Sequence, residues 1–258
     1  MDLELRDRVV LVTGGSKGIG LACAKGFAVE GARLALASRS EAHLFEAAQA
    51  VGGALTIAAD LSHSDQAARV VERVERELGP IDILVNSAGA ARRTPPDELT
   101  PAAWRVAMDA KYFTYINVID PTIKLMVGRG RGVIINIVGN GGKVASSSHL
   151  AGGAANAALM LATAGLAHTY AKRGVRVLAI NPGLTNTGRV AEGLEAMARQ
   201  QGISVEHARR RSLEQLAIGR LAEPEEIATL AVFAASPRAS YLTGVSISMD
   251  GASTPVVV

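Results

Sequence analysis

Two kinds of hydrophobic pattern alternate along the chain. Short apolar runs rich in β-branched residues, bounded by polar residues or glycine, predict buried strands. Between them, apolar residues recur at intervals of three and four, which predicts helices with one buried face. The predicted strands are residues 8–12, 33–37, 54–59, 81–86, 132–138, 175–181 and 245–249. The predicted helices are residues 18–30, 41–51, 64–77, 101–127, 152–173, 189–200, 205–217 and 223–235.

This regular alternation of strands and helices predicts one fold class. Strands joined by right-handed helical crossovers form an open parallel sheet that helices cover on both faces. We therefore expect a single α/β domain over residues 1–258, with a Rossmann-type, doubly wound parallel sheet of about seven strands. Residues 188–219 contain no predicted strand and are rich in charge, so they lie outside this pattern.

Composition narrows the classes of function. The 27 basic and 24 acidic residues leave a formal net charge of +3, which is too small to indicate a nucleic-acid-binding protein. The single cysteine, Cys23, excludes an internal disulfide. No signal peptide and no uninterrupted run of 18 apolar residues is present. We expect a cytoplasmic protein with no membrane partner and no metal site.

The stretch Val9–Gly20 gives the clearest indication of chemistry. An apolar run is followed by Gly14, Gly18 and Gly20, and a helical pattern begins at Ile19. A strand that turns through glycines into a helix can bind a pyrophosphate. The helix N-terminus presents free N–H groups, and the missing Cβ atoms let the phosphates approach the backbone.

The spacing Thr-Gly-x-x-x-Gly-x-Gly in this stretch resembles the short-chain dehydrogenase/reductase family. Further motifs follow in the order of that family, and together they cover essentially the whole chain. They are Asp60-Leu61, Asn86-Ser87-Ala88-Gly89, Asn181-Pro182-Gly183, Pro224-Glu225-Glu226-Ile227-Ala228 and Asp250-Gly251. The resemblance implies a Rossmann fold, a nicotinamide cofactor and an oxidoreductase.

The resemblance also implies a set of cofactor-binding residues, which come from the turns that follow the predicted strands. They are Gly14, Ser16, Lys17, Gly18, Ile19, Gly20, Arg39, Asp60, Leu61, Asn86, Ala88, Gly89, Pro182, Gly183, Thr185 and Thr187. Each glycine or proline among them is also compatible with ordinary turn chemistry.

The turn after the second predicted strand favours NADP (NADPH) over NAD. Ser38-Arg39-Ser40 contains no acid that would bond the ribose 2′-hydroxyl and repel a 2′-phosphate. The guanidinium of Arg39 can instead bind a phosphate through two N–H groups, and Lys17 adds a second positive charge. For both residues, a solvent-exposed cation without a ligand is the alternative interpretation.

The catalytic positions that the resemblance implies do not hold the residues typical of the family. The family uses a tyrosine as acid, a lysine four residues later, a serine that polarises the carbonyl, and an asparagine that anchors a proton relay. By register, these positions are held here by Gly152, Asn156, Gly139 and Lys111. Because glycine cannot donate a proton, carbonyl reduction would need another donor.

Two residues are candidates to replace the missing groups. His149 lies three residues before Gly152, and imidazole titrates near neutral pH, which suits a general acid or base. Lys111 could help to hold the nicotinamide ribose or stabilise an oxyanion. Asn140 and Asn156 are further candidates. The alternatives are that His149 lies on an exposed serine-rich loop without a function, and that Lys111 faces solvent or a subunit interface.

We therefore expect an NADP-dependent oxidoreductase with an unusual proton donor, acting on a small carbonyl, hydroxyl or activated alkene. A catalytically silent NADP-binding protein and a non-redox acid–base enzyme, such as a lyase or isomerase, are the alternatives. The resemblance also implies a homo-oligomer, a tetramer or dimer. It further implies that residues 188–219 form a mobile flap that selects a small-molecule substrate.

Overall fold

The computed structural model describes residues 1–89, 91 and 93–256. Its sheet has seven strands in the order β3-β2-β1-β4-β5-β6-β7, and every neighbouring pair is parallel. The strands are β1 Val9–Thr13, β2 Arg33–Ser38, β3 Leu55–Ala58, β4 Ile83–Asn86, β5 Gly132–Ile137, β6 Val175–Pro182 and β7 Ser246–Met249. The predicted α/β, Rossmann-type fold class is confirmed.

The α-helices alternate with the strands as the hydrophobic pattern predicts. They are α1 Gly18–Val29, α2 Glu41–Ala50, α3 Ser64–Glu77, α4 Pro101–Met108, α5 Thr114–Arg129, α6 Leu150–Tyr170, α7 Gly188–Gln201, α8 Val205–Glu214 and α9 Pro224–Ala235. Short helical turns complete the set: η1 Pro96–Glu98, η2 Asp109–Phe113, η3 Asn140–Gly142, η4 Ser147–His149, η5 Ala171–Arg173 and η6 Pro237–Ala239.

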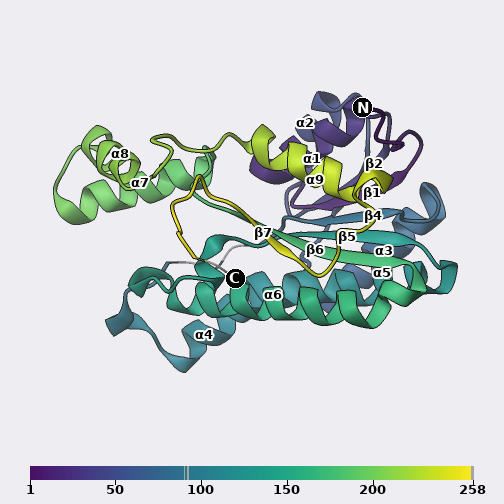
Figure 1. Cartoon of the computed structure of the whole chain (residues 1–258). Helices are drawn as coiled ribbons and strands as arrows, with labels where there is room; N and C mark the ends of the chain where they lie inside the picture. Colours follow the sequence, from purple (N-terminus) through teal and green to yellow (C-terminus); the bar gives the residue numbers. More distant parts are fainter. Residues whose placement is uncertain (90, 92, 257–258) are drawn as a thin grey trace.

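The helices form one layer on each face of the sheet (Figure 1). Successive residues of a strand point to opposite faces, so Val10 and Val12 of β1 join the core beneath α1, α2 and α9. Val9 and Leu11 join the core formed with α3, α5 and α6. Burial on both faces explains why the strands read as continuous apolar runs rather than as alternating ones.

One predicted helix, residues 101–127, is interrupted in the structure. It is divided into α4 and α5 by the π-helical turn η2. The Thr114 N–H reaches the carbonyl of Asp109, five residues back, and the Thr114 hydroxyl donates to the same carbonyl at 2.9 Å. The widened turn contains Lys111, which is buried. Apolar periodicity does not reveal one extra residue in a turn, because the pattern resumes beyond it.

Helices α7 and α8 project from the body of the protein (Figure 1). They pack on each other through a small cluster of their own, centred on Leu194, Ala198 and Ala208. These two helices make up most of the predicted flap, residues 188–219. Its role in selecting a substrate stays a prediction.

Helix α6 lies against the sheet. With η5 it forms a 24-residue segment, Leu150–Arg173, that is long and apolar enough to cross a membrane. However, 44% of its most apolar window is buried inside the protein, and Leu159 and Ala167 belong to the core. It is a core helix.

Candidate active site

The turn between β1 and α1 can accept an anion. Gly14 has φ +66°, and a Cβ atom there would lie 2.7 Å from the backbone nitrogen of Ala88. A Cβ atom on Gly20 would overlap the carbonyl oxygen of Gly14. Helix α1 begins at Gly18 without a side-chain cap and without an acidic residue in its first turn. Its first N–H groups are therefore available to a ligand with negative charge.

Three other predicted residues of this turn surround the helix N-terminus. Lys17 is exposed, and Ser16 and Ile19 are half-buried. The Lys17 side chain is therefore exposed to solvent beside the free N–H groups of α1.

A row of buried side chains joins the ends of β1, β4 and β5. The Thr13 hydroxyl donates to Asn86 Oδ1 at 3.3 Å, and Asn86 Nδ2 donates to Asn136 Oδ1 at 3.0 Å. Asn136 Nδ2 then donates to the Thr163 hydroxyl on α6 at 3.0 Å. Each of these four residues is at most 1% exposed. The row fixes the strand ends from which the loops of the site begin.

The loop after β4 connects the glycine turn to η2. Its Ala88 contacts Gly14, as described above. Gly89 has φ +83°, and a Cβ atom there would overlap the carbonyl oxygen of Ala110 in η2. The backbone of this loop therefore passes close to the turn that carries Lys111.

The ends of β2 and β3 bring together the residues predicted to bind the adenosine part of the cofactor. Ser38 Oγ is buried and has no hydrogen-bond partner among the described residues, and Arg39 beside it is exposed. The pKa of Asp60 is lowered, chiefly because the hydroxyl and N–H of Ser62 donate to its carboxylate, with a smaller contribution from Arg39. Leu61 is buried in the core.

The loop after β6 returns to the glycine turn. A Cβ atom on Gly183 would lie 2.9 Å from the Cα of Asp250, so this loop is packed against the C-terminal segment. The Thr185 hydroxyl donates to the carbonyl of Gly183. Thr187 lies beside the glycine turn, because a Cβ atom added to Gly18 would lie 3.4 Å from Thr187 Cγ2. Pro182, also a predicted site residue, is the last residue of β6.

The imidazole of His149 lies in the space beside Gly152. His149 ends η4, and a Cβ atom on Gly152 would overlap its Cε1 atom. On its other side, a Cβ atom on Gly141 would lie 3.0 Å from His149 Cδ2. His149 Nδ1 is buried and has no hydrogen-bond partner among the described residues. The ring is thus held between two glycines with one nitrogen unpaired.

Burial and positive charge both act on this imidazole. The pKa of His149 is lowered from its ordinary value, first by desolvation and then by the cations Arg93, Lys111 and Arg189. Both effects favour the neutral ring. His149 is half-buried, so the alternative that places it on an exposed loop is wrong, and its role as an acid or base stays a prediction.

The two predicted asparagines differ in their surroundings. Asn156 is buried, and its Nδ2 approaches the carbonyl of Gly139 at 3.5 Å. Asn140 donates through Nδ2 to the carboxylate of Asp250, while its buried Oδ1 has no partner among the described residues. The Asn140 side chain therefore ties η3 to the C-terminal segment.

Lys111 is buried among neutral groups. Its Nζ donates to the Tyr115 hydroxyl at 2.8 Å and to the carbonyl of Ile137 at 2.9 Å, and the Tyr115 hydroxyl also donates to Ile137. Desolvation, helped by the charge of Arg189, lowers the pKa of Lys111 to about 7. The interpretation that places Lys111 in solvent is wrong.

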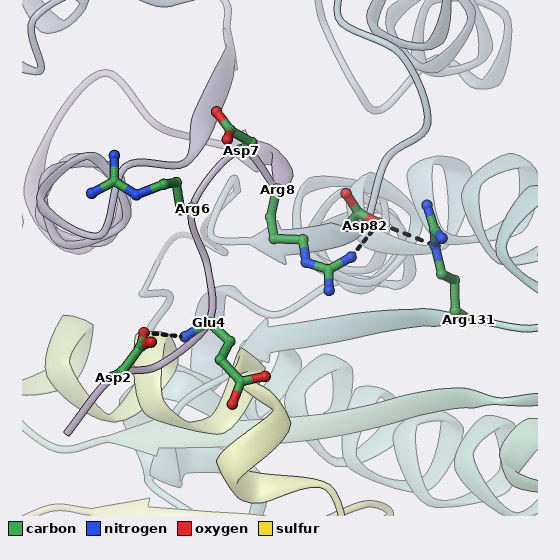
Figure 2. A pocket seen from close by; sticks show the side chains of 7 residues that line it. All are labelled: Asp2, Glu4, Arg6, Asp7, Arg8, Asp82 and Arg131. Atoms are coloured by element: carbon green, nitrogen blue, oxygen red, sulfur yellow. Dashed lines mark hydrogen bonds and ion pairs between the residues drawn. The ribbon is translucent and has the colours of Figure 1, made fainter.

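A polar hollow of about 460 Å³ lies far from these residues, at the amino ends of the strands. Figure 2 shows Arg8 and Arg131 both pointing toward Asp82, at 3.5 and 3.4 Å. A smaller hollow of about 170 Å³ lies between the loop after β6 and the C-terminal segment, lined in part by Leu184, Ile218 and Met249. The predicted site residues lie at the opposite edge from the first hollow.

The geometry agrees with comparisons to known proteins. Residues 8–198 match the short chain dehydrogenase protein family. The chain is 36% identical to galactitol 2-dehydrogenase (L-tagatose-forming) of Cereibacter sphaeroides, over 94% of this chain and 93% of the relative. It is 34% identical to cis-4-hydroxycyclohexanecarboxylate dehydrogenase of Sinomonas cyclohexanicum, over 97% and 98%. The chain belongs to the short-chain dehydrogenase family.

The fold of this short-chain dehydrogenase is close to that of a solved structure. L-sorbose reductase from Gluconobacter frateurii, complexed with NADPH and L-sorbose, superimposes with a TM-score of 0.94 at 30% identity, over the whole of both chains.

Sequence reasoning missed two residues of this short-chain dehydrogenase site. Tyr115 bonds Lys111 from one helical turn away, and the four-residue spacing in the sequence is the signal that could have found it. Arg189 acts electrostatically on Lys111, Tyr115 and His149. Its position two residues after Thr187, within a predicted cofactor turn, is a weaker signal.

The buried lysine gives a prediction about stability and pH. Between about pH 7 and 10.5, unfolded chains hold a proton on Lys111 that the folded protein has released, so the free energy of unfolding rises with pH across this window. Below about pH 7 both states hold the proton, and Lys111 causes no further change with pH. Replacing Lys111→Met should flatten this rise and stabilise the protein at pH 7 by roughly 1 to 4 kcal/mol. Urea unfolding at a series of pH values measures both effects.

Lys124→Met, an exposed lysine on α5 paired with Asp120, is the matched control and should leave the slope unchanged. An unchanged slope in Lys111→Met would show that Lys111 does not titrate in this range.

Proposed function

We propose that this short-chain dehydrogenase is an NADP-dependent oxidoreductase that uses His149 to carry a proton to or from a small alcohol or ketone. The observation that carries the proposal is the place of the His149 ring. It fills the space that a side chain on Gly152 would need, at the edge of the sheet to which the cofactor turns converge.

We infer that the four catalytic positions of the family correspond here to Lys111, Gly139, Gly152 and Asn156. Three contacts support this register. Asn156 Nδ2 approaches the carbonyl of Gly139, and a Cβ atom on Gly152 would meet His149. Lys111 donates to Ile137, two residues before Gly139. We infer that the four positions belong to one neighbourhood, which the His149 ring enters from η4.

The residues of the cofactor half fit NADPH. The glycine turn leaves no room for Cβ atoms and presents the free N–H groups of α1 to a pyrophosphate. Ser38 Oγ is buried without a partner beside the exposed Arg39, and a 2′-phosphate would satisfy both groups. The NADPH found in L-sorbose reductase agrees with this choice of cofactor.

NADPH would supply the hydride, and the chain must supply and remove the proton. His149 can do so because an imidazole can accept or donate a proton, and its lowered pKa favours the neutral ring that accepts one. Asn156 provides an amide beside the same loop. Below its pKa of about 7, Lys111 acts through its charge, since its Nζ is already engaged with Tyr115 and Ile137.

We also infer that the chain forms a homo-oligomer, a dimer or tetramer, in the cytoplasm. Large apolar side chains are exposed on the outer helical layer, among them Val106 of α4, Phe113 of η2 and Leu161 of α6. Leu161 is 77% exposed, which favours a covering partner. Sedimentation of the purified protein measures the assembly.

Cofactor titration tests the NADPH proposal. We expect NADPH to bind roughly tenfold or more tightly than NADH, and Arg39→Ala to remove that preference, because the 2′-phosphate loses its guanidinium partner. Arg33→Ala, an exposed arginine at the opposite end of the same strand, is the matched control. Calorimetry measures both affinities. Binding of neither nucleotide would favour the non-redox acid–base enzyme.

A double-mutant comparison tests His149 as the proton carrier. Gly152→Ala should displace the imidazole and lower turnover about as much as His149→Ala, roughly 10²-fold or more, and the double variant should be no slower. The assay uses whichever of galactitol, L-sorbose and 4-hydroxycyclohexanecarboxylate is turned over fastest.

Gly165→Ala is the matched control, because it lies on the same helix with nothing near its Cβ position. Full turnover in His149→Ala would assign the proton to another group. NADPH binding without turnover of any compound would favour a catalytically silent protein.

A further inference from the structure

The turn η3 is held between α6 and the C-terminal segment. On the C-terminal side, Asn140 Nδ2 donates to the carboxylate of Asp250 and, at a longer 3.5 Å, approaches the Thr254 hydroxyl. On the other side, a Cβ atom on Gly142 would lie 2.7 Å from the backbone nitrogen of Ala157 in α6. The turn therefore has no room to move toward α6, and side-chain bonds set its distance from the C-terminal segment.

Two side chains make these bonds. Lys143, which follows η3, donates through Nζ to the carbonyl of Ser246 at 3.2 Å and to the Ser248 hydroxyl at 3.1 Å. Asn140, the first residue of η3, holds Asp250. A carboxylate accepts hydrogen bonds, so the amide must face Asp250 with its nitrogen, and a bond to a charged acceptor is stronger than one between neutral groups. Because Lys143 keeps η3 joined to β7, loss of the Asn140 bond shifts the turn without releasing it.

The position of η3 matters because the turn lies against the His149 ring. A Cβ atom on Gly141, the middle residue of η3, would lie 3.0 Å from His149 Cδ2 and 3.5 Å from its Nε2. Gly152 of α6 borders the ring on another side. His149 Nδ1 has no hydrogen-bond partner among the described residues, so no bond at that nitrogen holds the ring in place. The backbones of Gly141 and Gly152 therefore define where the imidazole lies.

The backbone of Asp250 lies against the cofactor half of the site. The Gly183 N–H donates to the carbonyl of Met249 at 3.0 Å, and a Cβ atom on Gly183 would lie 2.9 Å from the Cα and Cβ atoms of Asp250. Gly183 belongs to the loop after β6, which is predicted to bind the cofactor. One residue thus contacts the cofactor loop through its backbone and η3 through its carboxylate.

We propose that Asp250 is a positioning residue: through Asn140, its carboxylate holds η3, and with it the His149 imidazole, in a fixed place relative to the cofactor loop. Asp250 transfers no proton itself. The inference rests on the proposed function, because that function gives the imidazole its catalytic use.

The experiment exchanges the two members of this hydrogen bond in the full-length protein. Asp250→Leu removes the acceptor, and Asn140→Asp sets a second carboxylate against the first, which repels it at pH 8. The double variant Asn140→Asp/Asp250→Asn restores one carboxylate and one amide in reversed order. Asp65→Leu is the matched control, because Asp65 is an exposed acid of α3 paired with Arg69.

Three quantities are measured in each variant. The NMR resonance of His149 13Cε1, assigned by its loss in His149→Asn, reports the surroundings of the ring without turnover. The kcat for the fastest-reacting compound of the substrate screen reports the catalytic step. Calorimetry with NADPH reports the cofactor half.

We expect Asp250→Leu and Asn140→Asp each to shift the His149 resonance and to lower kcat roughly tenfold or more, because a small displacement of a reacting group slows turnover. The reversed pair should return the resonance and bring kcat to within about threefold of the wild type, which a loss of folding would not allow. Asp65→Leu should change neither. NADPH affinity should stay within about threefold throughout, because the backbone of residue 250 still lies against Gly183.

Two results would overturn the proposal. One is a His149 resonance that does not move in Asp250→Leu. The other is a reversed pair that behaves like Asn140→Asp alone. If the resonance shifts and recovers as expected while kcat stays constant in every variant, Asp250 positions the ring and His149 does not carry the proton. Failure of the proposed function is thereby distinguished from failure of this inference.

Discussion

The hydrogen-bonded row Thr13, Asn86, Asn136 and Thr163 is the constraint on which the site depends. These side chains are buried where β1, β4 and β5 end, and each is hydrogen-bonded to its neighbour in the row. Losing one member would leave buried polar groups unpaired, at a cost of about 1–3 kcal/mol each. The row fixes the strand ends, and the loops that carry Gly14, Ala88 and Gly139 begin within a few residues of it.

The room beside Gly152 and the electrostatic surroundings of His149 then determine the chemistry that these loops can support. The absence of a side chain at Gly152 makes room for the His149 ring, and Gly141 leaves room on its other side. Desolvation by burial lowers the pKa of that ring and favours its neutral form, with smaller contributions from the charges of Arg93, Lys111 and Arg189. The proton chemistry therefore follows from the glycines that leave room for a partly buried imidazole.

The sequence predicted the fold because strand and helix periods are local properties. All seven strands and most helices were placed within about two residues, since buried parallel strands read as apolar runs. The interruption of residues 101–127 was not predicted, because a π turn changes hydrogen bonding without changing the apolar pattern. For the same reason the sequence left open whether Lys111 points into the site or faces solvent or a subunit interface. The contact between His149 and Gly152 depends on side-chain direction, which three-residue spacing alone does not define. Arg189 is 40 or more residues from His149 and Lys111 along the chain, so its electrostatic effect on them depends on the fold and cannot be predicted from the sequence.

The pH dependence of kcat/KM measures the central claim, that His149 carries the proton. Its pKa lies below the ordinary 6.5, because the ring is buried among cations. Alcohol oxidation needs the neutral ring, so kcat/KM for oxidation should fall as pH drops through that pKa, whereas ketone reduction should rise. Both pH dependences of kcat/KM, the fall for oxidation and the rise for reduction, should disappear in His149→Asn. If either pH dependence of kcat/KM is unchanged in that variant, His149 does not carry the proton.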